Sequence, residues 1–163
     1  MNDLLGPATV LLGAVGLAML AAGPILVING ALGRRQIRRE LTDQKISFPE
    51  AGRLPARLAR HAGRPVTTGP QAKAFSEVIA NNVNRMTAGR TYSEISAALH
   101  AAGGADEKLI ELRQTAFMGQ TLRASLLNAY QAWALASLVI VLGVLLTGAG
   151  GAFLVLGALF GTS

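Results

Sequence analysis

The residues of this sequence that could do chemistry are few, and two histidines come first among them. Non-haem iron can be held by two histidines and one carboxylate. His61 and His100, together with an acid such as Glu94 or Glu107, would supply enough ligands for such a set. The spacing does not support such a set, and both histidines sit beside alanines in modest helical segments. We therefore expect surface histidines, with no catalytic residue, no metal and no cofactor.

Other catalytic chemistry is no better supported. The chain has no cysteine, which excludes disulfides, thiolate metal sites and cysteine nucleophiles. The glycine-rich stretch 148–151 lacks the lysine of a phosphate-binding loop, and Asp106 and Glu107 are typical of the first turn of a helix. Three hydroxyl side chains lack an adjacent base that could activate them as nucleophiles: Ser125, Ser137 and Thr147.

A cluster of arginines is the other group with recognisable chemistry. It directly follows a stretch of about thirty residues with one charge, and it could bind nucleic acid, bind anionic lipid headgroups, or mark the end of a membrane segment. A nucleic-acid surface would need more basic residues and more aromatic rings for stacking, so we expect no nucleic acid partner. The lipid and topology interpretations are compatible, and they concern four residues: Arg34, Arg35, Arg38 and Arg39.

Charge is confined to the middle of the chain. Of the 163 residues, 51% are hydrophobic, and all fifteen lysines and arginines lie between Arg34 and Arg123. No charged residue follows Arg123. The pattern predicts a transmembrane helix over 4–32, a polar helical extramembrane domain over 33–125, and a second transmembrane helix over 126–161.

Both apolar runs exceed the roughly 20 residues needed to cross a bilayer core. The first lacks the basic start of a signal peptide, so we expect it to be retained. The second would span roughly 45 Å from Tyr130 to Phe160, so it must tilt, protrude or break, and 148–151 is the expected weak point. Tyr130 and Trp133 are expected to form an aromatic belt at the membrane interface.

Small residues recur every seventh position in both apolar runs. A seven-residue repeat keeps one line of residues on one face of a helix, and small residues on that line allow close approach in lipid. We predict that the two lines pack against each other in an antiparallel hairpin, and we call them the helix-packing seam: Thr9, Gly16, Gly23, Gly30, Ala129, Ala136, Gly143, Gly150 and Gly157.

The polar middle shows signals for three helices. An amphipathic pattern follows Gly69-Pro70 and closes at Gly89. Thr91 and Glu94 have the spacing of a capping box before a second helix, which should end at Gly103-Gly104. Asp106 can cap a third helix that runs without interruption into the second apolar segment. The predicted fold class is all-α: an integral membrane helical hairpin with a small helical domain between its transmembrane helices.

Four stretches of the chain resemble an actinobacterial family of small two-helix membrane proteins of unknown function. The resemblance covers most of the chain in order and is carried by 44-QKISFPEAG-52, 64-RPVTTGPQAKAFSEVIANN-82, 89-GRTYSEI-95 and 112-LRQTAFMGQTLRASLLNAY-130. Members of that family often carry an automatic label of aromatic ring-opening dioxygenase. The resemblance implies two membrane helices with a polar domain between them.

The expected location is the plasma membrane, and two arguments favour opposite sides for the middle domain. The positive-inside rule places residues 33–125 in the cytoplasm, because the stretch from Arg34 to Lys45 supplies five basic side chains and neither terminus carries one. The family resemblance implies an external middle domain. The sequence favours a non-catalytic accessory or assembly subunit of a larger membrane complex, with other integral membrane subunits or itself as partner. The alternative is an anionic-lipid-interacting membrane module or a self-associating membrane protein.

Overall fold

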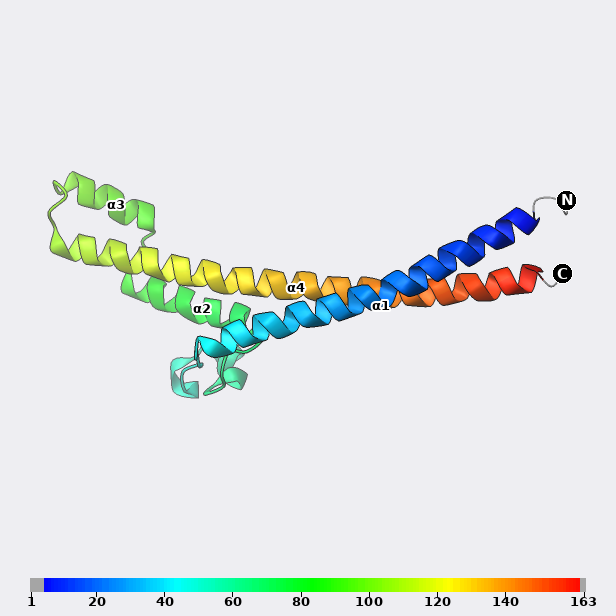
Figure 1. Ribbon diagram of the computed structural model, residues 1–163. Helices are drawn as coiled ribbons and strands as arrows, with labels where there is room; N and C mark the ends of the chain where they lie inside the picture. The colour runs from blue at the N-terminus through cyan, green and yellow to red at the C-terminus, as the bar shows by residue number, and fades with distance from the viewer. Residues whose placement is uncertain (1–4, 162–163) are drawn as a thin grey trace. The chain divides into compact units, whose positions relative to one another are not determined.

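A computed structural model describes residues 5–161, and these residues are almost entirely helical (Figure 1). The predicted start of the first membrane helix at residue 4 lies outside them. In chain order the elements are the helix α1 (Leu5–Asp43), the short 3-10 helices η2 (Ala51–Arg53) and η3 (Ala56–His61), and the helices α2 (Gly69–Met86), α3 (Tyr92–Ala101) and α4 (Glu107–Gly161).

The chain divides into two compact units. Unit 1 holds the residues up to Gln36 and from Trp133 onward, and unit 2 runs from Ile37 to Ala132. The long helices α1 and α4 contribute residues to both units.

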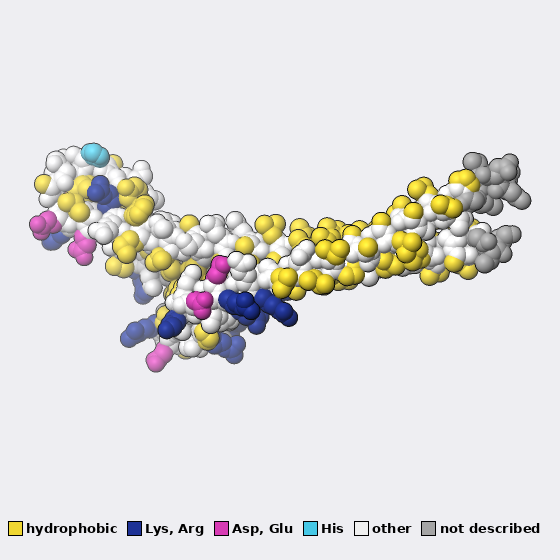
Figure 2. Space-filling view, viewed as in Figure 1, with side chains coloured by type: hydrophobic (Ala, Val, Ile, Leu, Met, Phe, Trp, Pro, Cys, Tyr) yellow, Lys and Arg dark blue, Asp and Glu magenta, His cyan; other side chains and the backbone are white. Residues whose placement is uncertain are grey.

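Unit 1 consists of two apolar helical segments that lie side by side (Figure 1). By length and composition, α1 and α4 are both able to cross a membrane, with mean hydropathy of 2.4 and 2.5 over their most apolar windows. On the face drawn in Figure 2, hydrophobic side chains cover this unit along its length. The outward surface is therefore the kind that lipid or a partner helix covers.

Unit 2 has its own hydrophobic core. The chain between α1 and α2 closes on itself through backbone hydrogen bonds from Phe48 N to Arg64 O (2.9 Å) and from Val66 N to Ile46 O (2.9 Å). This closed segment brings Phe48, Leu58 and Val66 against α2, the end of α1 and α4. The buried core residues are Leu41, Phe48, Leu58, Val66, Ala72, Ala74, Val78 and Leu126.

The predicted helix boundaries in unit 2 are confirmed. The Thr91 hydroxyl accepts from Glu94 N, and the Glu94 carboxylate accepts from Thr91 N, which is the expected capping box. Gly103 and Gly104 follow α3 with φ of +75° and +80°, a conformation that glycine adopts without strain. The Asp106 carboxylate accepts from Leu109 N at 3.1 Å and begins α4.

The long helix α4 runs from unit 2 into the apolar segment without interruption, as the sequence predicts. The expected weakness at 148–151 does not appear, because α4 continues through these residues to Gly161. A helix interior tolerates glycine at a cost of about 1 kcal/mol each, and α4 extends on both sides of these residues, from Glu107 to Gly161.

Candidate functional site

Glycines of α1 and α4 meet at the centre of unit 1. A Cβ atom added to Gly16 would lie 2.9 Å from the Gly150 carbonyl oxygen, and one added to Gly23 would lie 2.7 Å from the Gly143 carbonyl oxygen. Both distances are too short for a side chain, so the two backbones approach as closely as they do only because glycine occupies these positions. Thr147 also reaches the Gly23 position with its hydroxyl.

The same line of contacts continues toward both ends of unit 1. A Cβ on Gly30 would lie 2.7 Å from the Ala136 carbonyl oxygen, and one on Gly157 would lie 3.6 Å from the Thr9 carbonyl oxygen. Ala129, the remaining residue of the predicted seam, does not lie on this line and packs against the hydrophobic core of unit 2 instead. Eight of the nine seam residues are therefore brought into facing pairs: Thr9 with Gly157, Gly16 with Gly150, Gly23 with Gly143, and Gly30 with Ala136.

One residue of the arginine cluster pairs with the expected aromatic belt. The Arg34 guanidinium carbon lies 4.3 Å from the centre of the Trp133 ring, a distance at which the cation is attracted by the ring face. Trp133 is only 6% exposed, so its ring is covered rather than open to lipid headgroups. The pair ties the end of the apolar part of α1 to the start of the apolar part of α4.

The other members of the cluster present their side chains differently. Arg35, Arg38 and Arg39 are exposed on α1. Tyr130, the second residue of the expected belt, lies in unit 2 with the Lys73 ammonium 4.9 Å from its ring centre. Each predicted belt ring thus has a basic side chain over its face, contributed by a different helix.

No family model, curated protein or solved structure matches this chain. The family resemblance therefore stays a prediction.

The two histidines have different surroundings, and one differs from its prediction. His100 is exposed on α3 as expected. His61 is half-buried: its ring stacks on Phe48 with centroids 5.0 Å apart, its Nε2 accepts from Arg60 Nε at 3.1 Å, and its buried Nδ1 has no partner among the described residues. Within the described part of the chain, no three histidine, cysteine or acidic side chains lie close enough to share a metal ion.

The surroundings of His61 predict a pH dependence of stability. Desolvation, followed by the charges of Arg60 and Arg64, lowers the pKa of His61 below its ordinary value of 6.5. The unfolded chain therefore binds the proton more readily than the folded one, so the free energy of unfolding should fall as the pH falls through 6.5 toward the lower pKa of the folded state. Thermal unfolding midpoints measure this. His61→Phe keeps a ring over Phe48 and should lose that part of the pH dependence; an identical pH profile in both proteins would contradict the assignment.

The sequence did not single out a polar cleft in unit 2. It lies between η2 and the end of α2 and has a volume of about 420 Å³. Its α2 wall carries the run Asn81-Asn82-Val83-Asn84-Arg85, which is visible in the sequence as an unusual density of carboxamides. Only the fold brings Arg53 to the same cleft, because that residue comes from a separate turn.

Proposed function

We propose that the protein is a non-catalytic accessory or assembly subunit that packs, as a membrane helical hairpin, against other integral membrane subunits or against itself. The observation that carries this proposal is that some glycines of unit 1 pack α1 against α4, whereas others face open space. Gly16, Gly23, Gly143 and Gly150 are used in contacts within the chain. The outward face keeps its large apolar side chains exposed, which suits a helix surrounded by lipid and partner helices.

A second group of glycines is consistent with a partner helix packing on that outward face. Gly148 and Gly151 have no atom within 4 Å of the position where a Cβ would stand, so they line open space on α4. They do not break the helix. Small residues on an unoccupied face let another helix approach closely, as small-residue motifs do in membranes.

Purification of the tagged full-length protein in a mild detergent tests the proposal. We expect stoichiometric membrane proteins or a defined oligomer to be recovered with it. Gly148→Leu combined with Gly151→Leu should reduce that recovery, whereas Ala18→Leu with Ala21→Leu adds the same bulk to exposed positions of α1 and serves as the matched control. A clean monomer at every concentration would rule out the assembly role.

The second candidate function is an anionic-lipid-interacting module, favoured by the exposed arginines beside the covered Arg34–Trp133 pair. Basic residues next to a membrane helix each contribute about 1 kcal/mol of attraction to an anionic surface. Arg35→Gln, Arg38→Gln and Arg39→Gln together should abolish selective co-purification of anionic lipid and leave partner recovery unchanged. Arg34→Gln alone removes the cation that lies over the Trp133 ring, and its lipid content is compared with that of the triple variant. Unchanged lipid content in the triple variant would remove the support for this function.

A further inference from the structure

The polar cleft of unit 2 has the size and lining of a small-ligand site. The segment Gly52 to Pro55 forms one wall and the last two turns of α2 form the other. Its volume of about 420 Å³ falls within the roughly 300–1,000 Å³ that small-molecule sites occupy. The side chains that line it decide which class of ligand it can bind.

Hydrogen-bond donors dominate the lining. Two guanidinium groups, Arg53 and Arg85, and three carboxamides line the cleft, and no carboxylate is among its described lining residues. Arg85 donates to the Asn82 side-chain oxygen at 2.5 Å, which occupies that acceptor and leaves the amide hydrogens of Asn82 to donate elsewhere. The cleft therefore offers many donors and a positive charge to a ligand rich in acceptor oxygens.

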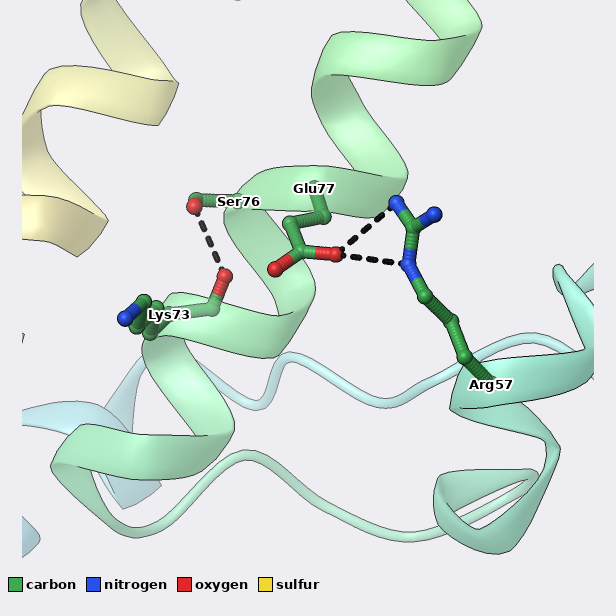
Figure 3. A network of polar contacts seen from close by, with 4 residues as sticks. All are labelled: Arg57, Lys73, Ser76 and Glu77. Atoms are coloured by element: carbon green, nitrogen blue, oxygen red, sulfur yellow. Dashed lines mark hydrogen bonds and ion pairs between the residues drawn. The ribbon is translucent and has the colours of Figure 1, made fainter.

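The charges around the cleft favour an anion as well. The only acid in the sequence of α2 is Glu77, one turn before Asn81. Its carboxylate is paired with Arg57, which donates from Nε at 3.1 Å and from a terminal nitrogen at 3.0 Å (Figure 3). The segment 53–64 contains four arginines and no acid, and Figure 2 shows basic side chains gathered over this part of unit 2. A concave surface of one sign raises the local concentration of the opposite ion.

The end of α2 is the one feature that would oppose an anion, because a helix carries partial negative charge at its carboxyl terminus. That charge resides on unsatisfied carbonyl groups. Here the Val83 carbonyl accepts from Thr87 N at 2.8 Å, and the Asn84 carbonyl accepts from Gly89 N at 2.8 Å. The turn that follows α2 thus satisfies these acceptors and leaves the side-chain donors to set the character of the cleft.

We propose that this cleft binds a phosphate-bearing anion, with Arg53 and Arg85 as its charge partners and the Asn81 and Asn84 amides as further donors. A phosphate group matches the planar donor pairs of arginine, and its several oxygens can accept from the amides at the same time. The proposal is independent of the assembly role proposed for unit 1. The phosphate can belong to a lipid headgroup or to a soluble molecule, and the chemistry of the cleft is the same for both.

The test uses the full-length protein in discs of zwitterionic phosphatidylcholine, titrated with inorganic phosphate and with chloride at equal ionic strength. We expect saturable shifts of the Arg85 and Asn81 side-chain NMR signals with phosphate only. Arg53→Gln with Arg85→Gln should weaken binding by at least about tenfold, the loss expected when charged hydrogen bonds are removed. Asn81→Asp, which keeps the side-chain size and adds a negative charge, should weaken it similarly.

Lys108→Gln with Arg113→Gln, which makes the same change of charge on α4, should bind phosphate as the unaltered protein does. Discs of phosphatidylglycerol identify the source of the phosphate. Shifts of the same signals without added phosphate assign the cleft to a lipid headgroup, and an unchanged phosphate titration in these discs assigns it to a soluble anion. Equal responses to chloride and phosphate, or unchanged affinity in the double arginine variant, would overturn the proposal.

Discussion

Gly23→Ala combined with Gly143→Ala should destabilise unit 1 by about 1–3 kcal/mol for each substitution, the usual cost of adding a methyl group to a filled interface. A Cβ at Gly23 would lie 2.7 Å from the Gly143 carbonyl oxygen, and a Cβ at Gly143 would lie 2.6 Å from the Gly23 carbonyl oxygen. Neither neighbour is a flexible side chain, so the two helices must move apart along their length. The chain has a single tryptophan, Trp133, whose fluorescence reports unfolding of this unit in mixed detergent micelles.

The matched control replaces glycines that face open space. Gly13→Ala with Gly148→Ala makes the same chemical change on the same two helices, and no atom lies within 4 Å of either new Cβ. Alanine favours a helix over glycine by about 1 kcal/mol, so the control should be neutral or slightly stabilised. If both pairs of variants unfold alike, close backbone contact does not limit the packing of α1 on α4.

Helix boundaries in unit 2 were predictable because their signals are local. The capping box of Thr91 and Glu94 needs residues three positions apart, and the end of α3 needs a glycine with positive φ at Gly103. The turn after α2 is less simple, because Ala88 as well as Gly89 has a positive φ there. The continuity of α4 followed from the same reasoning, since no proline or turn sequence separates Asp106 from the apolar segment.

The pairing of the seam was only partly predictable. The seven-residue repeat identifies which face of each helix carries small residues, but shifting one helix by seven residues still places small residues opposite small residues. The sequence alone therefore cannot choose among these registers. The structure pairs Gly16 with Gly150 and Gly23 with Gly143, and the Arg34–Trp133 contact belongs to the same register.

Contacts between distant segments were the least predictable part. The half-burial of His61 depends on the ring of Phe48, and the polar cleft depends on bringing residues 52–55 beside the end of α2. In the sequence, His61 sits between an arginine and an alanine, which resembles a surface segment. Tertiary packing rather than local propensity decides the surroundings of such residues.

Phe48→Ala should be the most damaging single substitution in unit 2, with an expected loss of about 3–5 kcal/mol of stability. Phe48 is 3% exposed, its ring stacks on His61, and the edge of Phe75 meets it with centroids 5.2 Å apart. Removing the ring leaves a cavity where the segment between α1 and α2 closes over α2. Amide hydrogen exchange of α2 in the full-length protein measures the loss locally, so that unit 1 does not mask it.

Phe117→Ala is the matched control, because it removes the same side chain from a position that is 59% exposed on α4. Its ring lies tilted against Tyr92 with centroids 6.1 Å apart, and because it is mostly exposed, its loss should change stability by no more than about 0.5 kcal/mol. The contrast follows from the surroundings of each ring: Phe48 is buried against His61 of η3 and Phe75 of α2, whereas Phe117 already exposes most of its surface in the folded protein. Comparable exchange in the two variants would mean that the segment around Phe48 contributes little to holding α2 in place.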